Sequence, residues 1–306
     1  MWRKLFARLI AQALLVTAIS LFGVNAQAAP PLVVATIPPV HSLVAGVMEG
    51  IGVPHLLLSG AASPHNYALR PSAARRLQSA RIVFWVGPAL EGFLSRSLAA
   101  LAGKARVVTL MQAPGMDLLA ARGRHHGERT DSPDPHFWLN PGNARRIVVL
   151  AADVLAGEDP QNATAYRSNA ARVKARLDTL AQRMKGRFAG TTIAPYILFH
   201  DGFQYLERAL GLSAAGFVTV APDRPPGARH LRDIRAVITG ASATCVFSEP
   251  QFEPRLIRAL VEGTGARIGA LDALGSGLQA GPGLYFQLME GNIGALGDCL
   301  VGPGGG

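Results

Sequence analysis

Short apolar runs alternate with longer amphipathic segments along most of the chain. Eight of the runs have the length and the flanking turn residues of buried strands, at 31–37, 53–59, 81–87, 105–111, 194–200, 214–220, 243–249 and 266–272. Helical patterns lie between them, at 71–80, 89–103, 201–210, 228–240 and 254–265. The alternation predicts an α/β fold of two lobes, each a mainly parallel sheet flanked by helices.

The segment between the two series of strands has the pattern of one long helix. It contains no Gly or Pro from Gln161 to Lys185, and it carries an apolar stripe of Tyr166, Val173, Leu177, Leu180 and Met184. We therefore predict an N-terminal lobe at 29–157, a connecting helix at 158–188 and a C-terminal lobe at 189–306. A rigid helical connector predicts small rocking of the lobes instead of a wide hinge.

The first 28 residues have the order of a secretory signal peptide. Arg3, Lys4 and Arg8 precede an apolar run from Leu9 to Val24, and the small-x-small motif Ala26-Gln27-Ala28 follows, which predicts cleavage after Ala28. The alternative is an N-terminal membrane anchor, but the run is shorter than the ~20 residues that a spanning helix needs. The first thirty residues contain no Cys, which excludes a lipid anchor. An exported protein without stable membrane insertion is expected.

Charge and cysteine content narrow the class further. The formal net charge is +10, but the arginines are scattered along helical segments and form no block with aromatic residues. This distribution indicates a basic soluble surface and not a nucleic-acid partner. An oxidising compartment favours a bridge between the two cysteines, Cys245 and Cys299, with two unpaired buried thiols as the alternative.

Four residues that could bind a metal follow predicted strands or precede a predicted helix: His65, His136, His200 and Asp272. Ligand sites in open α/β sheets form beyond the carboxyl ends of the strands, so these side chains, two from each lobe, would meet in one cleft. Three imidazoles and one carboxylate make a tetrahedral site suited to zinc. Helix capping or strand-end packing is the alternative for each histidine, and it is preferred for His41, His55 and His230.

Two further features have weaker interpretations. The polar insertion at 120–134, expected to be a flexible loop, carries His125 and His126, which would bind metal only weakly. Glu249 is the one carboxylate at a strand end that could act as a general base, as a zinc hydrolase would require. Orientation of His200, or an ion pair with an arginine, is the preferred role of Glu249.

The candidate residues lie in long motifs that resemble the ZnuA type of periplasmic zinc-binding proteins of ABC importers. These motifs are SPHNYALRPSAARRLQSARIVFWVGPALEGFL, DPHFWLNPGNARRI, ILFHDGFQYLERALGL and ATCVFSEPQFEPRLIRALVEGTGARIGALDALGSGL. By position in them, the family's three histidines fall on His65, His136 and His200, and the carboxylate of related metal-binding proteins falls on Asp272. The family's two cysteines match Cys245 and Cys299.

The resemblance implies a monomeric periplasmic protein that captures Zn²⁺ with high affinity and delivers it to an ABC permease driven by an ATPase subunit. Two departures from the family matter. The insertion holds only two histidines, and Pro64 stands where some relatives have a carboxylate, which leaves Asp272 or water as the fourth ligand. Imidazole at position 200 favours zinc over manganese, while copper stays open. A zinc-dependent hydrolase and a surface adhesin with an incidental metal are weaker alternatives.

Overall fold

The computed structural model describes residues 29–60, 62–65, 67–123, 129–220, 226–241, 243–252 and 255–301. The predicted signal peptide, His125 and His126 lie outside these residues. Residues from 31 onward cluster as one compact unit. Among the described residues, no helix is both long enough and apolar enough to cross a membrane.

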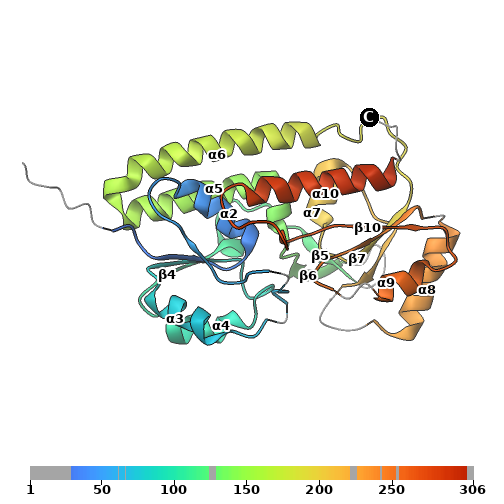
Figure 1. Cartoon of the computed structure of the whole chain (residues 1–306), viewed down its shortest axis with the longest axis horizontal. Helices are drawn as coiled ribbons and strands as arrows, with labels where there is room; N and C mark the ends of the chain where they lie inside the picture. Colours follow the sequence, from blue (N-terminus) through green and yellow to red (C-terminus); the bar gives the residue numbers. More distant parts are fainter. Residues whose placement is uncertain are drawn as a thin grey trace, which may run out of the picture. The chain divides into compact units, whose positions relative to one another are not determined.

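Two four-stranded parallel sheets confirm the predicted fold class (Figure 1). The first has the order β2-β1-β3-β4, and its strands are β1 (Val33–Ala35), β2 (His55–Leu56), β3 (Ile82–Trp85) and β4 (Arg106–Thr109). The second has the order β10-β9-β7-β8, and its strands are β7 (Tyr196–His200), β8 (Gly216–Thr219), β9 (Cys245–Ser248) and β10 (Arg267–Ala270). Each strand lies within a predicted run and is shorter than that run.

The helices cover both faces of the sheets. They are α2 (Pro38–Val47), α3 (Pro71–Ser79), α4 (Leu94–Leu101), α5 (Pro141–Glu158), α6 (Ala163–Met184), α7 (Gln204–Leu210), α8 (Ala228–Gly240), α9 (Arg255–Val261) and α10 (Leu284–Leu300). Three short 3₁₀ turns join them, η1 (Leu110–Gln112), η2 (Phe137–Leu139) and η3 (Pro160–Asn162). The long helix predicted between the two sheets is α6, whose 22 residues span about 33 Å. Its predicted apolar stripe is buried.

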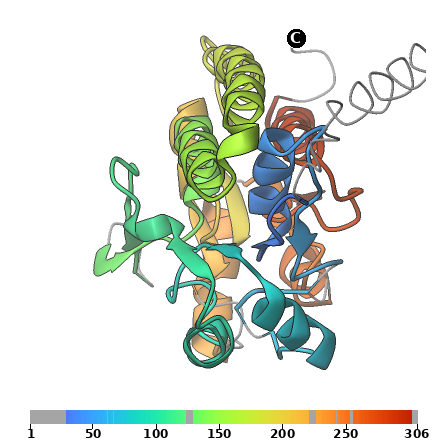
Figure 2. The ribbon, with the colours of Figure 1, turned by 90° about the vertical axis from the view of Figure 1, so that its left-hand side faces the viewer.

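Alternate residues of the central strands face different cores. In β3, Ile82 and Phe84 belong to a large core cluster, while Val83 and Trp85 belong to a smaller one that includes residues of α3 and α4. In β7, Tyr196 and Leu198 join the same large cluster, and Ile197 and Phe199 pack in a third cluster with residues of α8 and α9. The large cluster therefore extends along one face of both sheets, and α2, α5, α6 and α10 contribute to it. Figure 2 shows these helices gathered on one side of the sheets.

The segment predicted as a flexible loop contains regular structure at both ends. β5 (Ala120–Arg122) and β6 (Arg129–Pro133) pair as an antiparallel hairpin. Cross-strand backbone hydrogen bonds here do not depend on an apolar pattern, so the polar sequence gave no signal for strands. The hairpin leads directly to His136. α5 follows, with Pro141 in its first turn and the Asn140 side chain accepting from the Gly142 N–H at 2.7 Å.

Candidate metal centre

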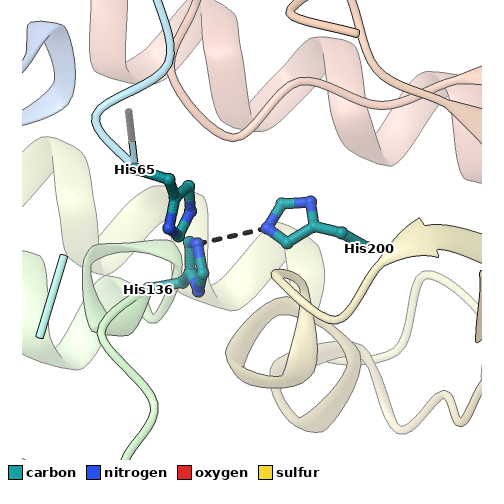
Figure 3. Close-up of side chains that lie close together, drawn as sticks. All are labelled: His65, His136 and His200. Carbon is teal, nitrogen blue, oxygen red and sulfur yellow. Dashed lines mark hydrogen bonds between the residues drawn. The ribbon is translucent and has the colours of Figure 1, made fainter. Parts of the chain in front are cut away.

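Three histidines from distant parts of the chain point toward one another (Figure 3). His65, His136 and His200 each offer one ring nitrogen, and these nitrogens all lie within 4.8 Å of one another. The Nε2 atoms of His136 and His200 are 3.2 Å apart. Nitrogens at about 2.0 Å from one metal ion lie about this far from one another, so the arrangement suits a single ion bound by three imidazoles.

His136 is held in one orientation by Asp134. The Oδ1 atom of Asp134 accepts from the His136 backbone N–H at 3.0 Å and from Nδ1 at 2.8 Å. Although burial raises the pKa of Asp134, the hydrogen bonds from His136 outweigh it and leave this pKa below its usual value. The ionised carboxylate accepts the Nδ1 proton, so the lone pair of Nε2 faces the centre.

His200 is oriented in the same way by Glu249. His200 is the last residue of β7, and Glu249 directly follows the neighbouring strand β9, so the parallel sheet brings the two side by side. Glu249 accepts from both the Nδ1 and the backbone N–H of His200. Gly202 leaves room for the ring, because a Cβ there would collide with the His200 imidazole.

His65 is the least buried ligand candidate, and it lies in the loop after β2. Burial, together with the neighbouring His136 and His200, lowers its pKa to about 2. For His200, burial alone would lower the pKa, but the Glu249 carboxylate raises it above the usual value. His65 and His200 therefore have unequal proton affinities, and His65 is neutral throughout the physiological range.

The space between the rings is small and has largely apolar walls. A cavity of about 10 Å³ lies there, lined by the three histidines and by side chains that include Trp138, Phe252 and Leu274. This volume is about that of one water-sized sphere and cannot admit an organic substrate. The Trp138 indole donates to the Ala273 carbonyl at 2.8 Å. This bond joins η2 to the loop after β10 and fixes the wall of the cavity.

Asp272, the predicted fourth ligand, is not part of the group formed by the three histidines. Its Oδ1 atom accepts from the Leu274 and Gly275 N–H groups and from the Gln251 amide at 2.8–2.9 Å, and its Oδ2 accepts from Ser276 N at 2.5 Å. The carboxylate thus organises the loop at 272–276, which supplies Ala273 and Leu274 to the wall of the centre.

The remaining predicted residues have separate positions. A disulfide joins Cys245 in β9 to Cys299 in α10. His41 and His230 bond to the backbone carbonyls of Pro54 and Val218, each at 3.0 Å, and both lie outside the histidine group, as does the exposed His55.

Sequence reasoning missed Asp134, Gly202 and Arg122. Asp134 had a readable signal, since an Asp two residues before a candidate ligand can reach its Nδ1. Gly202, two residues after His200, had a weaker sequence signal. Arg122 had none, because its partners Asp201 and Glu207 lie about eighty residues away.

The donor set determines what this centre can do. Three imidazole nitrogens, two of them held by buried carboxylates, match borderline-soft transition metals such as zinc. Glu249, the one candidate general base of a hydrolase, accepts from His200 through Oε1. Among the described residues, this is the one group of three or more His, Cys, Asp or Glu side chains arranged to hold a metal.

Two parallel-sheet regions, a long helix between them and a three-imidazole centre define a metal-binding solute-binding protein. The chain belongs to the family described as ZnuA, zinc-uptake complex component A, periplasmic, which it matches over residues 33–299. It is 38% identical to the high-affinity zinc uptake system protein ZnuA of Brucella abortus, over 88% of this chain and 91% of that protein.

Other relatives agree with this assignment. The ZnuA protein of Paracoccus denitrificans is 33% identical over 94% of this chain and 97% of its own length. The fold matches the crystal structure of a ZnuA deletion mutant with zinc bound, with a TM-score of 0.77 and 23% identity over 90% of this chain and 100% of that one.

Proposed function

We propose that this protein captures Zn²⁺ in the periplasm and delivers it to the membrane permease of an ABC importer driven by an ATPase subunit. The observation that carries the proposal is the convergence of His65, His136 and His200 on a space for one ion. The zinc uptake role of the named relatives supports the choice of metal and of partner. Zinc is the cargo, so the chain itself needs no ATP site.

The proposed cycle uses the two parts of the chain. Residues 29–157 and 189–306 act as lobes around the centre, with 158–188 as the connecting helix, and a monomer is the working unit. His65 and His136 come from the first lobe and His200 from the second, so a bound ion ties the lobes together. Because one core runs beneath both sheets, release requires a small rocking and not a wide opening.

The fourth coordination position belongs to water in this proposal. Asp272 has its oxygens occupied by the loop at 272–276, and moving it to a metal would leave the N–H groups of Leu274, Gly275 and Ser276 without partners. Asp272→Asn should therefore leave zinc affinity within about threefold. A loss above a hundredfold, in a variant with an unchanged melting temperature, would restore Asp272 as a ligand.

The test of function is the metal content of the purified protein by mass spectrometry, followed by competition among zinc, manganese and copper. One bound zinc per chain, retained against manganese, is the expected result. His136→Ala should weaken zinc by several orders of magnitude, while His230→Ala, His125→Ala and His126→Ala should have little effect. Comparable losses in all four variants, or retention of manganese in place of zinc, would refute the proposal.

A further inference from the structure

A buried ionic cluster joins the β5–β6 hairpin to the region of the second sheet. Arg122, at the end of β5, contacts the Asp201 carboxylate through Nε and Nη2 and contacts Glu207 Oε2 through Nη2 at 2.7 Å. The Arg122 side chain is 19% exposed, and the two carboxylate side chains are 5% exposed each. Ion pairs this well shielded keep much more of their strength than surface pairs.

The acceptors of Arg122 are themselves fixed in place. The Oε1 atom of Glu207 accepts from the Tyr196 hydroxyl at 2.8 Å and from the Ala214 N–H at 2.6 Å, so Glu207 is anchored to β7 and to the segment before β8. Asp201 directly follows His200. Arg122 therefore connects the hairpin to the same rigid element that presents the third histidine.

Neutral hydrogen bonds hold the start of β5. The Tyr205 hydroxyl accepts from the Leu119 N–H at 2.8 Å, and the Gln204 amide donates to the Ala120 carbonyl at 3.2 Å. Arg122 supplies the charged contact at the end of β5. Without it, this end of the strand would lose its ion pairs with Asp201 and Glu207 and would keep its pairing with β6.

Arg122 also lines a larger cavity beside the metal centre. A cavity of about 350 Å³ has His65 and His136 among its lining residues, together with Arg122 and Asp201. The space between the rings is about 10 Å³. An ion that leaves the centre into the larger cavity therefore passes beside the Arg122 cluster.

We propose that Arg122 is a positioning residue that holds the end of β5 in place beside this cavity, as a latch, and thereby slows the release of zinc. The inference rests on the proposed function, since it concerns the same centre. Arg122 faces two carboxylates, so the cluster carries net negative charge and does not repel an incoming cation. The latch controls the rate of zinc exit, while the three histidines supply the coordination.

The latch and a purely electrostatic role predict opposite results. Replacement of Arg122 by Ala leaves Asp201 and Glu207 without their cation, which makes the cavity more negative. If Arg122 acted only through its charge, the variant would hold zinc longer, because a more negative cavity attracts the ion. If Arg122 acts as a latch, the variant loses zinc faster.

The experiment is stopped-flow dissociation of zinc from the full-length mature protein into an excess of chelator, at 25 °C and below the melting temperature of every variant. Arg122→Ala should release zinc about tenfold faster, and Arg122→Lys, which can reach only one carboxylate at a time, should release it at least threefold faster. Arg208→Ala is the matched control, because Arg208 joins α7 to Asp117 at 3.4 Å but is more than half exposed and lies outside both cavities.

The outcomes separate this inference from the proposed function. An acceleration of threefold or more in Arg122→Ala and Arg122→Lys, with Arg208→Ala within twofold of the wild type, supports the latch. A smaller acceleration, a slower release, or an equal effect in Arg208→Ala overturns it while the proposed function stands. If Arg122→Ala does not fold, Arg122→Lys decides by the same threshold. A wild-type protein that binds no zinc would overturn the proposed function and the latch together.

Discussion

Glu249 gives the sharpest test of how the centre is tuned. Its carboxylate accepts the Nδ1 proton of His200, and its side chain is only 2% exposed. Glu249→Gln keeps the size of the side chain and an oxygen acceptor but removes the negative charge. The variant therefore isolates the contribution of charge to the basicity of Nε2.

The expected magnitude follows from the burial of the pair. A hydrogen bond to a charged group contributes about 1.5–3 kcal/mol, against about 0.5–1.5 for a neutral one, and solvent does not screen the charge here. The loss of about 1–1.5 kcal/mol corresponds to zinc binding about tenfold weaker at pH 7.5. Glu249→Ala removes the acceptor as well, and we expect a loss of about a hundredfold.

The pH dependence provides a second readout. Because Glu249 raises the pKa of His200, it also helps protons to compete with zinc. The difference in zinc affinity between Glu249→Gln and the wild type should therefore be smaller at pH 5.5 than at pH 7.5.

Competitive titration with a chelator of known affinity at pH 7.5 and 5.5 measures both effects, with the exposed Glu290→Gln as the control. The reasoning would be refuted if Glu249→Gln bound zinc as tightly as the wild type at pH 7.5. It would also be refuted if the difference in zinc affinity between the two proteins were larger at pH 5.5.

Three other predictions concern pH and stability. The zinc affinity of the wild type should fall from pH 7.5 to 5.5. The fall should begin above pH 6.5, because His200 holds its proton more tightly than a free imidazole. Equal affinities at the two pH values in chelator titrations would exclude an imidazole centre. Cys299→Ser should lower the free energy of unfolding in urea by about 4 kcal/mol, since Cys245–Cys299 closes a span of 54 residues; a loss under about 1 kcal/mol would contradict the chain-entropy account. Burial raises the pKa of Glu91 from 4.5 to about 7, so the folded state keeps a proton that the unfolded state releases. Stability should then decline by about 3 kcal/mol as pH rises from 4.5 to 7, and Glu91→Gln should lack this decline in urea unfolding measured across that range.

The sequence pattern located the short buried strands and the helices with one apolar stripe, and it missed α2 and α10. β3 and β7 are short apolar runs between turn residues, and α6 has one buried stripe, so each was predictable. All ten residues of α2 are buried, so it shows no polar face and no period. α10 contains Gly291, Gly294 and Gly297, which lower its helix propensity.

Part of the candidate site could also be predicted from the sequence, and part could not. His65 and His200 were predictable because they follow parallel strands, and His136 was predictable because it directly precedes the helix that begins at Pro141. Asp272 also follows its strand, but its carboxylate is occupied by backbone N–H groups of its own loop, and the geometry of that loop is not a property of the local sequence. The Arg122 cluster depends on the packing of the hairpin beside α7, so only the folded chain shows it.

The contact between α10 and α2 has a consequence for how the chain folds. Near the start of α10, the Tyr285 backbone N–H donates to the Ser42 hydroxyl at 3.0 Å, across 243 positions of sequence, and the Tyr285 hydroxyl donates to the Trp138 carbonyl at 2.8 Å. The core beneath the first sheet therefore stays open until the last helix has been made. Contacts this distant in sequence form slowly. A chain that is still being synthesised therefore cannot complete this core while α10 is still to come.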